Sequence, residues 1–145
     1  MALQDVTPII SDGHWLSCGG MMKIDEITEK VIGACFEVIN ELGAGFLETV
    51  YEKSLLIALR QKGLLAQAQV PIEVQFRDQI VGQYVSDIIV ENRVCVELKA
   101  VKQLAPEHLA QTINYLRATG LPTALLVNFG SKKLEYRRLN NRIEK

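Results

Sequence analysis

The spacing of apolar residues changes several times along the chain, beginning with two stretches at helical spacing. Residues 24–41 carry apolar side chains on one side of a helix, and residues 46–62 resume the same pattern after Gly43 and Gly45. Gly63 follows at a position where helices commonly end. We therefore predict a helical first part of the domain, interrupted at the two glycines.

The middle of the chain alternates apolar and polar residues with a period of two, which is typical of strands. Residues 72–76 and residues 80–84 form two such runs with a turn between them. Residues 85–99 then read VSDIIVENRVCVELK, in which a polar turn centred on Asn92 separates two further runs. We expect these segments to pair as consecutive antiparallel strands.

The last part of the chain returns to a helix and then to strands. Residues 106–119 have helical spacing and stop at Gly120. Residues 124–127 are continuously apolar, as in a strand buried on both faces, and residues 134–138 form a weaker strand. The expected order is α, β, β, β, α, β, β, which predicts an α/β fold.

Composition supports one globular domain and excludes several classes of protein. The chain has 145 residues, 48% hydrophobic and 23% charged, which suits a packed core rather than disorder. No run approaches the roughly 20 apolar residues of a membrane span, and the N-terminus lacks a basic start followed by an apolar run. Residues 1–22 show no clear period, so we expect a loose extension before a domain over residues 23–145.

The cysteines and the charges bear on the environment and partners of the protein. Three cysteines without a CxxC spacing predict free thiols in a reducing compartment, hence a cytoplasmic protein. The net charge of −1 argues against a protein that coats nucleic acid. Residues 130–145 nevertheless hold six basic and two acidic side chains, which either meet phosphates or form a solvated edge strand.

The hairpin around Asn92 brings two acids together. In a register that pairs Val90 with Val94, Asp87 faces Glu97 at roughly 5 Å between Cβ atoms, and Lys99 follows on the same face. Like charges in that position destabilise a sheet, whereas a divalent cation such as Mg²⁺ would offset the repulsion. The alternative is a solvent-facing salt bridge between Lys99 and either acid, and the pattern leaves both open.

A third acid lies in the upstream helical stretch. Gly45, Glu48 and Tyr51 are three residues apart and so share one side of a helix. Glu48 is either a surface residue or points into a cleft over the sheet. Tyr51 is either an aromatic of the core or of a cleft wall, or a platform on which a base stacks.

At this point the residues resemble a known family. GFLETVY at 45–51 fits the G-x-x-E-x-x-Y signature of the GxxExxY proteins. The same family's later blocks match in order, as SDIIVENRVCVELKAV, QTINYL and LLVNFG at residues 86–101, 111–116 and 125–130. The resemblance covers about residues 24–139. The family is assigned to the PD-(D/E)xK nuclease superfamily, so it implies a restriction-endonuclease-like core with a central mixed sheet flanked by helices.

The resemblance also implies roles for individual residues. The expected metal ligands are Glu48, Asp87 and Glu97, which with Lys99 and Gln111 make up the expected catalytic set. Gln111 and Tyr115 look like the Q-x-x-x-Y element on the helix after the lysine strand. Tyr51 and Tyr115 are the expected substrate-binding residues. One departure is Ser86, which stands where the superfamily name has proline.

These implications give an expected function and one alternative. The expected function is a Mg²⁺- or Mn²⁺-dependent nuclease that hydrolyses phosphodiester bonds of nucleic acid, with DNA as the expected substrate. No membrane partner is expected. A homodimer would help a chain with so little positive surface to hold its substrate. The alternative is a non-catalytic nucleic-acid- or protein-binding module on a nuclease scaffold.

Overall fold

The computed structural model describes residues 22–141, so the predicted extension over residues 1–22 lies, apart from Met22, outside the described residues. Three helices and five strands follow one another in this part of the chain. They are α1 (Ile24–Leu42), α2 (Glu48–Gln61), β1 (Ala66–Phe76), β2 (Gln79–Val90), β3 (Val94–Lys99), α3 (Pro106–Thr119), β4 (Thr123–Asn128) and β5 (Glu135–Asn140).

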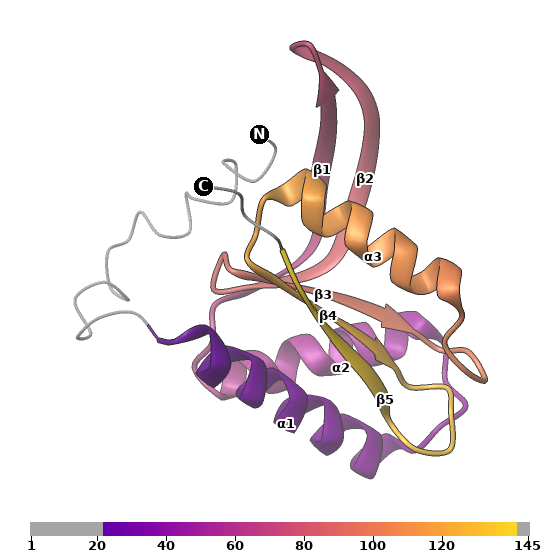
Figure 1. Cartoon of the computed structure of the whole chain (residues 1–145). Helices are drawn as coiled ribbons and strands as arrows, with labels where there is room; N and C mark the ends of the chain where they lie inside the picture. Colours follow the sequence, from indigo (N-terminus) through magenta and orange to yellow (C-terminus); the bar gives the residue numbers. More distant parts are fainter. Residues whose placement is uncertain (1–21, 142–145) are drawn as a thin grey trace.

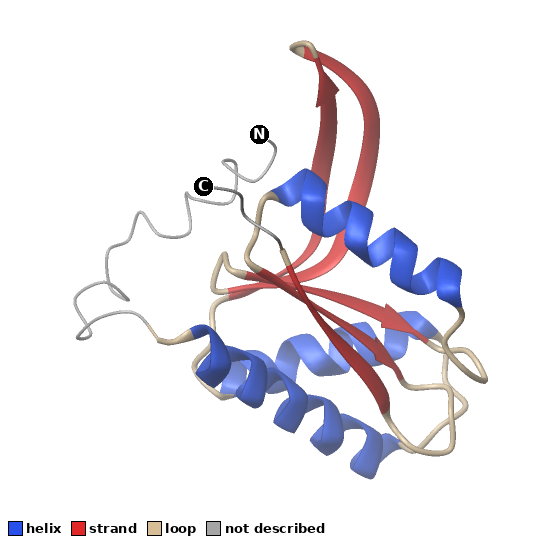
Figure 2. Cartoon of the chain, in the orientation of Figure 1, coloured by secondary structure: helices blue, strands red, loops and turns tan. Residues whose placement is uncertain are grey.

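The strands form one mixed sheet in the order β1-β2-β3-β4-β5. β3 and β4 are parallel and the other neighbours are antiparallel, because α3 carries the chain back across the sheet between β3 and β4. Figure 1 and Figure 2 show α1 and α2 on one face and α3 on the other. The predicted single α/β domain with a central mixed sheet flanked by helices is confirmed.

The predicted interruption of the helical first part is confirmed, whereas the first strands differ from their predicted bounds. The helical part is two helices that pack on each other, since Gly43 and Gly45 adopt positive φ angles of 77° and 109° that end one helix and redirect the chain. β1 begins at Ala66 instead of residue 72, and β2 runs without a break through the two predicted runs of residues 80–90.

The hairpin between β2 and β3 has the predicted register. Val90 pairs with Val94 and Ile88 with Val96 across a three-residue turn. Glu91 stabilises that turn, because its carboxylate accepts a 2.7 Å hydrogen bond from the Leu65 N–H. The predicted apolar face packs into the core shared with α1 and α2, and its residues are Ile88, Val90, Val94, Val96 and Leu98.

The alternation of side chains changes face at one point of β1 and β2. Ile88 points toward α1 and α2, whereas Val70 and Tyr84, also at even positions, point toward α3. The change falls at Gln69 and Asp87, which would face each other but form no ladder pair. Gln69 adopts a φ of 55°, a left-handed conformation that is uncommon for a residue other than glycine. The strand pair therefore turns as it passes this point.

Beyond the turn, the outer parts of β1 and β2 leave the body of the domain. Figure 1 shows them curving away from the sheet beside α3. We call this hairpin, residues 70–86, the arm. Its root lies at Asp87, the first acid of the predicted site.

The basic C-terminal segment contributes an edge strand. Within residues 22–141, β5 pairs only with β4, so it is an edge strand of the described sheet. Arg138 of β5 forms a 2.9 Å ion pair with Asp25 of α1. One basic side chain of the C-terminal segment is therefore paired within the domain. The last basic residues, Arg142 and Lys145, lie outside the described residues. The edge-strand interpretation of this segment therefore holds for its described part.

The described cysteines are buried and unpaired. Cys35 lies in the core under α1 and Cys95 in the core under α3, so the sheet separates them. Burial raises the pKa of the Cys35 thiol to about 12. Cys18 lies outside the described residues. Over residues 22–141, no helix combines the length and the apolarity that crossing a membrane requires.

The segment that follows Lys99 is held by a side-chain clamp from β4. Asn128 accepts a 2.9 Å hydrogen bond from the Val101 N–H and donates one of the same length to the Val101 carbonyl. Gly130 lies so close to this segment that a Cβ there would overlap the backbone of Ala100 and Val101. The end of β3, which carries Lys99, depends on this contact.

Gly130→Ala is therefore expected to destabilise the protein by at least about 2 kcal/mol, because the new Cβ would overlap backbone atoms that cannot move aside cheaply. Gly33→Ala is the matched control. No atom lies within 4 Å of the position that a Cβ would take at Gly33 in α1, so the change should stabilise the helix by about 0.5–1 kcal/mol. Urea unfolding of both variants measures the difference. Equal effects of the two substitutions would contradict the close approach at Gly130.

Candidate active site

Two acids lie side by side where β2 and β3 separate, at the root of the arm. Regular pairing of the strands ends at Ile88 and Val96. One residue further on, the Asp87 carboxylate accepts a 2.8 Å hydrogen bond from the Leu98 N–H through Oδ2. A side chain thus takes a donor on β3 that a strand carbonyl would otherwise use. Asp87 and Glu97 are neighbours, as predicted, but not members of a regular ladder pair.

Glu97 is held by two side chains on the α3 side of the sheet. Only 6% of Glu97 is exposed. The fully buried Ser86 hydroxyl donates a 2.8 Å hydrogen bond to Oε2, and the Cys95 thiol lies 3.3 Å from the same oxygen. Ser86 thus orients Glu97, which the sequence did not reveal. The available signal was its position directly before Asp87, in place of the proline of the superfamily name.

The pair is electrostatically unfavourable when both acids are ionised. Burial raises the pKa of Glu97 to about 8, and the nearby charge of Asp87 adds to the shift. Burial also raises the pKa of Asp87, against the opposing effect of the Leu98 N–H. The pKa of Tyr115 is raised by burial first and then by both acids. At neutral pH the pair therefore retains a proton unless a positive charge binds beside it.

This arrangement fits a divalent cation. Mg²⁺ typically takes one or two carboxylates and completes its coordination with water and phosphate oxygens. Asp87 and Glu97 supply two carboxylates that repel each other, and a cation removes that repulsion. Asp87 and Glu97 are thus the described residues that could hold the metal.

Lys99 and Gln111 meet across β3 and α3. The Lys99 ammonium donates a 3.3 Å hydrogen bond to Oε1 of Gln111, and its charge lowers the pKa of Asp87. The alternative salt bridge does not form, because the ion pairs of the described residues are Lys62–Glu37 and Arg138–Asp25. A cation without a carboxylate partner can act on a bound anion.

Glu48 is not brought to the carboxylate pair. It lies exposed in the first turn of α2, and the described residues contain no group of three His, Cys, Asp or Glu that could hold a metal. The acid of α2 that acts on the pair is Glu52, which lies one turn after Glu48. Its charge raises the pKa of Asp87. Glu52 also accepts a 2.8 Å hydrogen bond from Gln69, the residue at the turn of β1. The sequence signal for Glu52 was its position four residues after Glu48.

Tyr51 does not have the position that a substrate-binding residue needs. It is fully buried, its ring stacks on Phe129 at 4.7 Å, and its hydroxyl donates a 2.6 Å hydrogen bond to the Gly43 carbonyl. A side chain without exposed surface cannot contact a substrate, so the predicted role of Tyr51 is wrong for this conformation. Tyr51 instead fixes the loop between α1 and α2.

Tyr115 is nearly buried as well, at 9% exposed, because Tyr84 of the arm packs against it with ring centroids 5.4 Å apart. Tyr84 is 46% exposed and is the aromatic of this region that a ligand can reach. The sequence placed Tyr84 in a strand, but its side of the sheet depends on the turn at Asp87.

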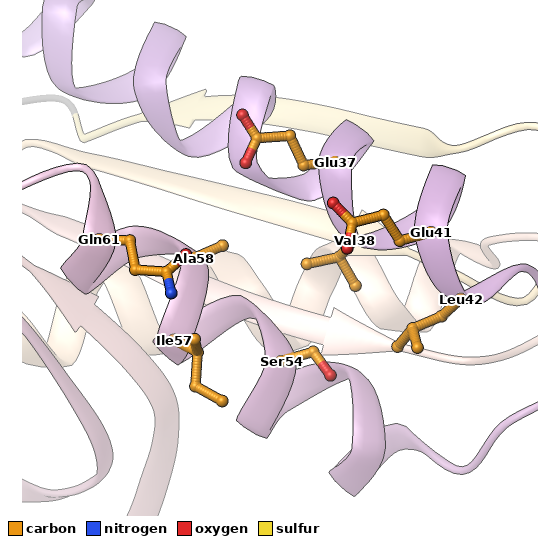
Figure 3. A pocket seen from close by; sticks show the side chains of 8 residues that line it. All are labelled: Glu37, Val38, Glu41, Leu42, Ser54, Ile57, Ala58 and Gln61. Carbon is orange, nitrogen blue, oxygen red and sulfur yellow. The ribbon is translucent and has the colours of Figure 1, made fainter.

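A separate groove of about 190 Å³ lies between α1 and α2 and contains none of the predicted site residues (Figure 3). Two of its lining residues are acids, Glu37 and Glu41, which would repel phosphate. The groove is therefore not part of the candidate active site.

Comparison with known proteins agrees with the fold and identifies a superfamily. The family model described as "PD-(D/E)XK nuclease superfamily" matches residues 25–139. The chain therefore belongs to the PD-(D/E)XK nuclease superfamily. The matched residues include Asp87, Glu97 and Lys99, which stand in this chain as D-x9-E-x-K.

A solved structure supports the fold, whereas a search of curated proteins found no relative of this chain. A crystal structure of the protein SSO0001 is similar to this chain with a TM-score of 0.53 and 16% sequence identity. The similarity covers 67% of this chain and 52% of SSO0001, so the chain spans about half the length of that protein. No curated protein matches the chain.

The raised pKa of Glu97 predicts how stability depends on pH without metal. Glu97 titrates near 8 in the folded protein and near its ordinary value of 4.5 when unfolded, so between these values the folded state holds the extra proton. The free energy of unfolding in EDTA should therefore fall as the pH rises from about 5 to 8, and then level off. Glu97→Gln should flatten this fall, whereas Glu37→Gln, at the surface, should leave it unchanged. Urea unfolding at several pH values measures this dependence. If the free energy of unfolding fell equally steeply with pH in wild type and Glu97→Gln, the raised pKa would not belong to Glu97.

Proposed function

We propose that this protein is a Mg²⁺- or Mn²⁺-dependent nuclease that hydrolyses phosphodiester bonds of DNA at the Asp87–Glu97 pair. The observation that carries the proposal is a pair of acids with raised pKa values, Glu97 buried and Asp87 partly buried, next to a lysine that has no carboxylate partner among the described residues. A structural salt bridge would neutralise such a pair within the protein. Membership of a nuclease superfamily supports nucleic acid as the substrate.

The cation would be held by Asp87 and Glu97. Bound there, a divalent ion supplies charge stabilisation to the phosphoryl group and lowers the pKa of water. Ser86 and the Leu98 N–H keep the two carboxylates oriented, so that the site needs little rearrangement when it loads.

Lys99 would act on the substrate directly. Its ammonium can position the attacking water or stabilise negative charge on the phosphoryl oxygens as the bond breaks. Gln111 holds that ammonium from α3 through its amide oxygen, so it is a positioning residue. Tyr115 forms the wall between this amide and the arm.

The third acid of the site would come from α2. We keep Glu48, on the resemblance to the GxxExxY proteins, and add Glu52, whose charge acts on Asp87 in this conformation. Comparing the Mn²⁺ affinities of Glu48→Gln and Glu52→Gln by calorimetry identifies the acid, because only the one that reaches the ion weakens its binding.

The proposal extends to the environment and assembly of the protein. The two buried unpaired cysteines support a reducing compartment such as the cytoplasm. A homodimer would double the surface available to nucleic acid, and sedimentation of the purified chain tests it.

The alternative is a binding module that keeps the nuclease scaffold without cleavage. The one observation in its favour is that, among the described residues, no third acid joins Asp87 and Glu97. Metal binding without cleavage of any substrate would support it.

The decisive experiment compares Lys99→Ala with Lys133→Ala, an exposed lysine outside the site. With Mn²⁺ and a panel of single-stranded, duplex and branched DNA and RNA, we expect Lys99→Ala to lose at least about 100-fold in cleavage rate, because one charge-stabilising donor is removed. Its Mn²⁺ affinity, measured by calorimetry, should stay near that of wild type. Lys133→Ala should cleave like wild type. Equal cleavage by the two variants would contradict the proposed role of Lys99.

A further inference from the structure

A groove of about 440 Å³ lies between the arm and α3. Its volume is within the range of ligand sites in proteins. Val74, Gln75 and Tyr84 line it from the arm, and Asn114 and Arg117 from α3. It is the hollow next to the aromatic pair that borders the carboxylates, since Tyr84 packs on Tyr115 and the acids raise the pKa of Tyr115.

One side of α3 runs continuously from the candidate active site into this groove. Gln111, which binds Lys99, lies one turn before Tyr115 and two turns before Ala118, and Ala118 also lines the groove. Seven residues of helix span about 10 Å. At a spacing of about 3.4 Å per stacked nucleotide, this is about three nucleotides. A strand whose phosphate lies at Lys99 would reach the groove with its neighbouring nucleotides.

Tyr84 gives the groove a flat aromatic surface in a fixed position. It is 46% exposed, while its other side packs on Tyr115 at an interplanar angle of 50°. Because Tyr115 already restricts the Tyr84 side chain, Tyr84 loses little conformational entropy when a base stacks on its open side. Gln75 and Asn114 supply amide groups that can bond base edges or the sugar-phosphate backbone.

The charges of the groove limit what can bind there. Arg117 and Glu73 are its two charged lining residues and balance each other, and the whole chain has a net charge of −1. A duplex held by its phosphates needs many basic side chains. An unpaired strand gains affinity from stacking of its bases on aromatic rings, which a duplex cannot provide because its base faces are covered.

From these observations we propose that the groove between the arm and α3 binds an unpaired strand of nucleic acid, with one base stacked on Tyr84. The inference rests on the proposed nuclease function and adds the substrate class to it. The enzyme would then act on single strands, flaps or ends, with the scissile phosphate at Lys99 and the adjoining nucleotides in the groove.

Fluorescence anisotropy with a short labelled single-stranded DNA and the matching duplex, in EDTA to prevent cleavage, tests the proposal. Wild type should prefer the single strand. Tyr84→Ala should weaken that binding about 5- to 100-fold, as the loss of one base–aromatic stack does elsewhere. Tyr84→Trp should retain it. Val85→Ala is the matched control, because Val85 is equally exposed, at 47%, but the alternation of the strand points it to the other face of the arm.

Crosslinking gives a second measurement that does not rely on substitution. A single strand carrying 5-iodouracil, irradiated on the wild-type protein, should join to the peptide that contains Tyr84. A crosslink confined to peptides outside the arm and α3 would overturn the proposal, as would equal binding by Tyr84→Ala and Val85→Ala. A preference for duplex over single strand would overturn it too.

The outcomes separate this inference from the proposed function. If wild type cleaves DNA in Mn²⁺ and Tyr84→Ala binds the single strand as well as wild type, the groove assignment fails and the nuclease proposal stands. If wild type binds the single strand through Tyr84 but cleaves nothing, the groove assignment stands and the chain is a binding module.

Discussion

The hydrogen bond from the Leu98 N–H to the Asp87 carboxylate is the contact on which the site and the shape of the domain depend. It ends the ladder between β2 and β3 and replaces a strand carbonyl with a side chain. At the same point β1 passes through Gln69 in a left-handed conformation, and the two outer strands turn toward α3. The acids and the arm therefore arise from one local interruption of the sheet.

This interruption has an energetic cost that the rest of the structure offsets. The buried Glu97 and the partly buried Asp87, both with raised pKa values, destabilise the metal-free protein at neutral pH. Ser86 and Leu98 compensate each carboxylate in part, while the apolar face of the same hairpin packs fully against α1 and α2. The stable half of the hairpin thus holds the unfavourable half in place, as is common at functional sites.

Much of the hairpin was predictable, because alternation and a polar turn fix register wherever one face is buried. The pairing of Ile88 with Val96 followed from Asn92 alone. The meeting of Lys99 and Gln111 followed from resemblance to the family's blocks. The turn at Gln69 was not predictable, because the residue in the left-handed conformation is itself neither a glycine nor an asparagine, and Pro71, two residues later, does not specify which way the strand turns. For the same reason the sequence did not reveal that Tyr84 faces α3, that Ser86 reaches Glu97, or that Glu52 acts on Asp87. The burial of Tyr51 depends on Phe129, which is 78 residues away in sequence and comes near only in the folded domain.

The central claim is that Asp87 and Glu97 form a coupled pair that a divalent cation relieves. Carbon NMR of the protein with labelled glutamate carboxyl groups measures the titration of Glu97 directly. We expect Glu97 to titrate near pH 8 without metal, and its pKa to fall both on addition of Mg²⁺ and in Asp87→Asn. A Glu97 that titrates near its ordinary pKa of 4.5 in the metal-free protein, unchanged by Mg²⁺ and by Asp87→Asn, would contradict the account.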